Sequence, residues 1–159
     1  MRRVFQDISL SSADVLIDIG CGKGRILALA LAMQCGYVRG IDTSSVLCGC
    51  ALRNLNKLCM SLRLEGKPFE VVNEDAAEYK FMGDETVIFL FNPFGANTVT
   101  KLVKNLLQSI ENTPHRCRIV YRNPVFGSLI GSRPEWRKTY TGTVFGDAYA
   151  VFSYEENHG

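Results

Sequence analysis

The stretch Asp18-Ile19-Gly20-Cys21-Gly22-Lys23-Gly24-Arg25 decides how this sequence folds. It follows an apolar segment at 15–19 that is typical of a buried strand, and it opens a Leu- and Ala-rich segment at 24–35 that is typical of a helix. Glycines between a strand and a helix allow a tight turn and let a ligand approach the backbone closely. The alternative is a plain strand-to-helix turn without a ligand.

Outward from this loop, strand-like and helix-like segments alternate along the chain. Such alternation predicts an α/β fold, namely a doubly wound, mostly parallel seven-stranded sheet with helices on both faces and a late antiparallel strand. The length of 159 residues predicts a single domain over 1–159. Helices are expected from Ser44 or Ser45 to about 65 and around 99–110. Further strands are expected at 37–41, 69–72, 86–91, 118–121, 140–145 and 149–154.

Acidic residues follow the second and third expected strands, where parallel α/β sheets bind their ligands. Asp42 ends the second strand, and a carboxylate there can accept both hydroxyls of a ribose. Asp75 and Ala76 follow the third, and an acidic side chain with the next backbone N–H can bind the edge of an adenine. The alternatives are a helix-capping acid beside Ser44 for Asp42 and a solvated acidic turn for Asp75.

With these motifs, the chain from about Asp14 to Tyr154 resembles class I S-adenosylmethionine-dependent methyltransferases. It is most similar to small bacterial members with an Asp-x-Gly-Cys-Gly-Lys-Gly-Arg loop. The resemblance implies S-adenosylmethionine as cofactor and S-adenosylhomocysteine as product. It also implies a set of cofactor-binding residues, which are Asp18, Gly20, Cys21, Gly22, Gly24, Asp42, Asp75 and Ala76.

Each of these residues has a role that the resemblance implies. The three glycines of the loop would lie against the methionine end of the cofactor, and Asp18 would help hold its amino group, often through water. Asp42 would bind the ribose, and Asp75 with Ala76 the adenine.

The motif Asn92-Pro93-Phe94-Gly95 follows the fourth expected strand. In the family, an Asn- or Asp-Pro-Pro-aromatic motif at this place binds the amino group that is methylated. The Asn side-chain carbonyl and the Pro carbonyl accept its two N–H groups, which aims the nitrogen lone pair at the methyl. We therefore take Asn92, Pro93 and Phe94 as candidate catalytic residues. Because Phe94 replaces the second proline and Gly95 the aromatic, a turn that only closes the cofactor pocket is the alternative.

Composition excludes several other classes of protein. The net charge of +2 gives no general sign of nucleic-acid binding. The six cysteines form no Cys-x-x-Cys pair and there are two histidines, so we expect no metal site and reduced thiols. No apolar run is long enough to span a membrane and no signal-peptide core is present, so a cytoplasmic protein without a membrane partner is expected.

The sequence therefore predicts a methyltransferase acting on an amino group of a protein or nucleic acid, with the acceptor itself unidentified. One alternative is a non-catalytic cofactor-binding or scaffold module. Another is a nucleotide-dependent oxidoreductase, which is disfavoured because Arg25 stands where a dinucleotide loop has its third glycine. Basic and aromatic residues alternate in the segment 123–140, as in some nucleic-acid-binding surfaces, although a solvated face or loop is the commoner explanation.

Overall fold

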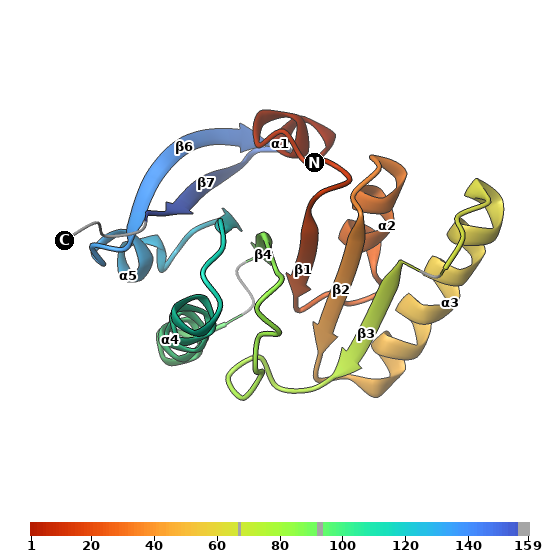
Figure 1. The fold of residues 1–159 in the computed structure, drawn as a ribbon, viewed down its shortest axis with the longest axis horizontal. Helices are drawn as coiled ribbons and strands as arrows, with labels where there is room; N and C mark the ends of the chain where they lie inside the picture. The colour runs from red at the N-terminus through yellow and green to blue at the C-terminus, as the bar shows by residue number, and fades with distance from the viewer. Residues whose placement is uncertain (67, 92–93, 156–159) are drawn as a thin grey trace. The chain divides into compact units, whose positions relative to one another are not determined.

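The computed structural model describes residues 1–66, 68–91 and 94–155 (Figure 1). The chain divides into two compact units, Met1–Ala76 and Ala77–Gly159. The single domain expected over 1–159 stays a prediction. No helix in the described ranges is both long and apolar enough to cross a membrane.

The first unit contains three parallel strands in the order β3-β2-β1. Their register places Asp18 beside Gly40 and Asp42 beside Asn73, so polar residues gather at the carboxyl ends of the strands. Helices α2 and α3 pack against these strands and against each other. The elements are α1 (Arg2–Asp7), β1 (Val15–Ile19), α2 (Arg25–Ala32), β2 (Tyr37–Asp42), α3 (Ser45–Leu62) and β3 (Phe69–Asn73).

The second unit contains four strands in the order β4-β5-β7-β6. Strands β4 and β5 are parallel, whereas β7 runs antiparallel to both β5 and β6 and forms with β6 a long curved hairpin (Figure 1). The late antiparallel strand is thereby confirmed. The elements are β4 (Val87–Phe91), α4 (Ala96–Asn112), β5 (Arg118–Arg122), α5 (Gly127–Gly131), β6 (Trp136–Val144) and β7 (Asp147–Tyr154).

The two long helices form where the sequence predicts them. Ser44 caps α3 by accepting a hydrogen bond from the backbone N–H of Leu47 at 3.3 Å, and a left-handed residue, Arg63, ends it. Helix α4 buries one apolar stripe, which consists of Val99, Leu102, Val103, Leu106, Leu107 and Ile110.

Three features differ from the expectation. The sequence reading did not predict the short helices α1 and α5, because five or six residues carry too little periodicity to detect. Strand β6 begins at Trp136 rather than at residue 140, because Trp136 already pairs with Tyr154 of β7. A register shift between Lys138 and Tyr140 also interrupts the alternation on which strand prediction depends.

Candidate functional site

The loop after β1 needs its glycines. Gly20, Gly22 and Gly24 have φ angles of 82°, 55° and 76°, in the left-handed region that favours glycine. The backbone N–H groups of Gly20 and Cys21 both donate to the Ile41 carbonyl, at 2.8 and 2.9 Å, and hold the loop against the end of β2. A Cβ at Gly22 would meet nothing within 4 Å, so open space lies beside this residue.

Cys21 anchors the loop on a glycine of the neighbouring strand. A Cβ at Gly40 would lie 2.8 Å from the Cys21 sulfur and 2.6 Å from Leu27 Cδ1, so only glycine lets these side chains pack on β2. Burial, and after it the charges of Asp18 and Asp42, raise the pKa of the Cys21 thiol to about 12. Cys21 is therefore a neutral packing group at physiological pH and not a nucleophile.

Asp18 is a buried carboxyl group, and its side chain has no hydrogen-bond partner in the described ranges. It lies in β1 and is 3% exposed. Burial, together with the neighbouring charge of Asp42, raises its pKa from 3.8 to about 7. A buried carboxylate without a donor is costly, so this position is suited to an incoming cation or hydrogen-bond donor.

Asp42 links the glycine loop to the start of α3. Its Oδ2 accepts from the Gly22 N–H and its Oδ1 from the Ser44 N–H, both at 2.9 Å. The helix-capping alternative is thus partly correct for this residue. Because a carboxylate has about four acceptor positions, two remain for the hydroxyls of a ligand.

The segment after β3 contains the last two residues predicted to bind the cofactor. Asp75 is exposed, whereas Ala76 is 2% exposed. The Asn73 side chain and the Glu74 N–H donate to the Asp42 carbonyl, at 2.9 and 3.2 Å, which fixes this segment beside the end of β2.

Of the candidate catalytic residues, Asn92 and Pro93 lie outside the described residues. Phe94 is half-buried, and Gly95 is the N-cap of α4. The elements on either side of the motif, β4 and α4, form where the sequence predicts a strand and a helix.

The sequence analysis missed a cluster at the ends of β4 and β5. Phe91 is 47% exposed, and the Arg122 guanidinium lies over its ring at 4.3 Å. Arg122 also pairs with Asp147 at 2.6 Å, and its buried Nε has no partner within the described ranges. Phe91 and Arg122 each end a strand, and the rule used for Asp42 would have found them.

The basic and aromatic residues of 123–140 do not form one surface. Trp136 is 3% exposed and packs edge-on against Tyr154, while Arg137 pairs with Glu155 at 2.7 Å. Strand alternation thus places the tryptophan in the core, and the idea of a nucleic-acid surface here loses its main aromatic group.

The fold is that of the class I S-adenosylmethionine-dependent methyltransferases. An RNA methyltransferase from Salinibacter ruber, solved with S-adenosylhomocysteine, is 20% identical with a TM-score of 0.74, covering 99% of this chain and 92% of its own. A SAM-dependent methyltransferase from Aquifex aeolicus is 16% identical with a TM-score of 0.73, covering 96% and 87%. Magnesium protoporphyrin IX methyltransferase from Synechocystis, solved with bound SAM, is 15% identical with a TM-score of 0.62, covering 89% and 69%. None of the curated protein sequences matches this one significantly.

The family model for the histone methylation protein DOT1 matches residues 1–129. The chain therefore belongs to the DOT1 family and is an S-adenosylmethionine-dependent methyltransferase. This assignment confirms the resemblance, the fold class and the cofactor expected from the glycine loop.

Proposed function

We propose that this chain transfers a methyl group from S-adenosylmethionine to an amino group of a protein or nucleic acid. Asp18 carries the cofactor part of the proposal, because it is a buried carboxyl without a hydrogen-bond donor in the described ranges, next to a glycine loop. The ammonium group of the cofactor would supply the donor and the positive charge that this site lacks.

The other residues of the first unit fit the same cofactor. The open space at Gly22 admits a ligand close to the backbone, where any larger side chain would intrude. Asp42 keeps free acceptor positions for ribose hydroxyls while its bonds to Gly22 and Ser44 hold it in place. Ala76 with Asp75 would contact the adenine.

The acceptor part of the proposal is supported by the sequence and by the proteins that this chain resembles. The motif Asn92-Pro93 follows β4, as an amine-binding motif does in this class. The matching family is that of the histone methylation protein DOT1, and one similar structure is an RNA methyltransferase, which favours an acceptor on a macromolecule. Phe94, or the exposed ring of Phe91, would wall the acceptor group.

The chemistry asks the chain mainly to position two reactants. When bound, S-adenosylmethionine supplies an activated methyl on a sulfonium, a good leaving group. Asn92 and Pro93 would accept the two N–H groups of the amine and direct its lone pair along the line of attack. Transfer would form a nitrogen–carbon bond and leave the electron pair of the broken carbon–sulfur bond on the sulfur of the cofactor, and the amine nitrogen would give up a proton to water. A neutral amine needs no base on the protein for this step.

Binding and transfer test the two parts separately. Calorimetry with S-adenosylhomocysteine should show binding that Asp42→Ala weakens by roughly 1–3 kcal/mol, since hydrogen bonds to a charged group are lost. The control Glu65→Ala removes an exposed carboxylate of the same unit and should bind normally. Tight binding of a nicotinamide dinucleotide, with none of S-adenosylhomocysteine, would contradict the cofactor site.

The acceptor is tested with labelled cofactor offered to histones and, separately, to cellular RNA. Asn92→Ala should lower turnover by about 10- to 1000-fold and leave cofactor affinity nearly unchanged, because only the amine loses a partner. Transfer to a thiol, hydroxyl or carboxylate, or full turnover in the variant, would refute the amine site. Lost cofactor binding in the variant would assign Asn92 to the cofactor instead.

A further inference from the structure

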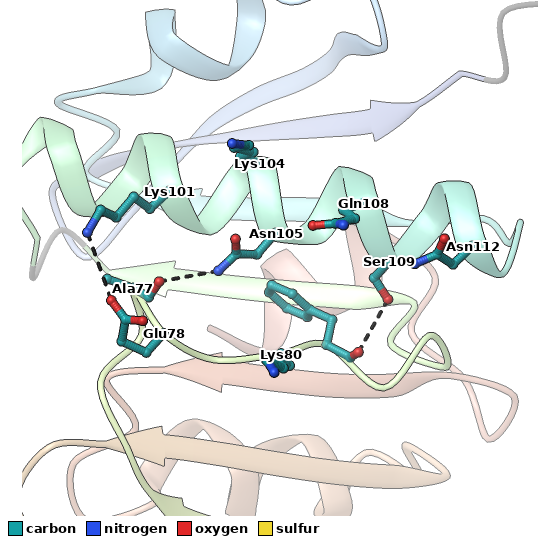
Figure 2. Close-up of a pocket in the computed structure, with 10 residues that line it drawn as sticks. Ala77, Glu78, Lys80, Lys101, Lys104, Asn105, Gln108, Ser109 and Asn112 are labelled. Atoms are coloured by element: carbon teal, nitrogen blue, oxygen red, sulfur yellow. Dashed lines mark hydrogen bonds and ion pairs between the residues drawn. The ribbon is translucent and has the colours of Figure 1, made fainter.

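A groove of about 650 Å³ lies within the second unit, between helix α4 and the segment 77–81 (Figure 2). It belongs to neither part of the site described above. Its lining is mostly polar and comes from both sides, namely from Ala77, Glu78, Lys80, Phe81, Lys101, Lys104, Asn105, Gln108, Ser109 and Asn112.

Side chains of α4 hold the opposite wall of the groove in place. Asn105 donates to the Ala77 carbonyl at 3.2 Å (Figure 2). It also donates to the Tyr79 carbonyl at 3.3 Å, and Ser109 donates to the Phe81 carbonyl at 3.4 Å. Tyr79 is 5% exposed and packs edge-on against Phe81, with ring centroids 5.2 Å apart. The groove is therefore built into the fold, since both walls are tied together.

The lining of the groove is positively charged. It contains Lys80, Lys101 and Lys104 against one acid, Glu78. Only Lys101 pairs with that acid, at 3.9 Å and with both side chains at least half exposed, so the pair is weak. Lys80 and Lys104 make no ion pair with any described residue. Two ammonium groups are thus available to an anion.

The donors form a track along the helix and not a single point. Lys101, Lys104, Gln108 and Asn112 recur every three or four residues, so they share one stripe of α4 about 16 Å long. The amides of Gln108 and Asn112 have no hydrogen-bond partner in the described ranges. An extended row of lysines and amides suits a chain of phosphates better than one isolated anion.

We propose that this groove binds single-stranded nucleic acid, with the lysines and amides on its phosphates and a base against Phe81. Lysine and amide side chains are common phosphate contacts, and aromatic side chains in a basic groove stack single-stranded bases. The proposal does not depend on methyl transfer, because binding is measured without cofactor.

The test measures binding of a fluorescein-labelled single-stranded RNA 20-mer to the whole chain by fluorescence anisotropy at several salt concentrations. Lys80→Gln/Lys104→Gln should weaken binding by about 10-fold at low salt and reduce the salt slope by about 1.4, since two phosphate contacts are lost. The matched control Arg2→Gln/Lys57→Gln removes two exposed charges of the first unit and should keep the wild-type slope. Thermal melting checks that both variants fold.

Three outcomes would overturn the proposal. The first is a wild-type chain that does not bind the RNA at low salt. The second is an equal loss of affinity in the groove variant and in the control, which would mean that overall charge alone attracts the RNA. The third is polyglutamate or duplex RNA bound as tightly as the single strand, which would reassign the groove to an acidic peptide or to a duplex.

Discussion

Replacing Asp18 by asparagine should make the protein more stable and less able to bind its cofactor. The wild-type carboxyl has a pKa of about 7 in the folded chain against 3.8 when unfolded, because it is buried near Asp42. A raised pKa means that folding favours the protonated form of Asp18. The loss of stability caused by its ionised form is therefore fully present above pH 7 and disappears as the pH falls towards 3.8. Asparagine has nearly the same shape and is neutral at every pH.

The size of the effect follows from the shift. At 1.36 kcal/mol per pH unit, ionised Asp18 costs up to about 4 kcal/mol at pH 8. Asp18→Asn should therefore raise the free energy of unfolding by up to about 4 kcal/mol at pH 8. At pH 5, where the wild-type carboxyl is protonated, this increase should be about 2–3 kcal/mol smaller. Urea unfolding without cofactor at the two pH values measures it.

The control for this variant is Glu65→Gln, which makes the same chemical change at an exposed position and should alter stability little at either pH. Calorimetry should show weaker binding of S-adenosylhomocysteine to Asp18→Asn, because the ammonium group of the ligand loses a charged hydrogen-bond acceptor. A variant less stable than the wild type at pH 8, or a stability difference that does not change with pH, would show that Asp18 is already compensated in the folded chain.

Two further predictions concern the thiols and the strand under the loop. Without reductant, a thiol reagent should label half-buried Cys50 first in the native protein, because the other five cysteines are buried and burial also raises the pKa of thiols such as Cys117. After unfolding, the reagent should label all six cysteines. Mass spectrometry would identify any cysteine that is labelled only after reduction, and such a cysteine would contradict the prediction of six free thiols. Gly40→Ala should destabilise the protein by about 1–3 kcal/mol, since its methyl would crowd Leu27 and Cys21, and an unchanged melting temperature would show that these side chains yield freely.

The sequence predicts those parts of the fold that depend on local chemistry. The glycine loop, the Ser44 cap and the apolar stripe of α4 are each specified by residues close together in the chain, and the structure contains all three. Trp136 illustrates the opposite case. Its neighbours Arg137 and Lys138 suggest an exposed segment, and only pairing with β7 makes it part of a strand with a buried ring.

In the candidate site, too, some features can be predicted from the local sequence and others depend on the three-dimensional structure. The position of Asp18 and Asp42 at strand ends is visible in the sequence, because strand ends can be predicted from apolar runs. The isolation of Asp18 from every described donor cannot be seen there, since it depends on which groups surround it in three dimensions. The stacking of Arg122 on Phe91 likewise requires the parallel register of β4 and β5.

The groove along α4 is held together through backbone atoms, and this has a consequence for how it can evolve. Asn105 and Ser109 grip carbonyl groups, which every amino acid carries, so the shape of the segment 77–81 does not depend on the side chains at 78 and 80. The charges at those two positions, now Glu78 and Lys80, can change sign without loss of the scaffold. Related chains can therefore acquire new ligands at this surface by single substitutions, while Asn105 and Ser109 should tolerate exchange poorly.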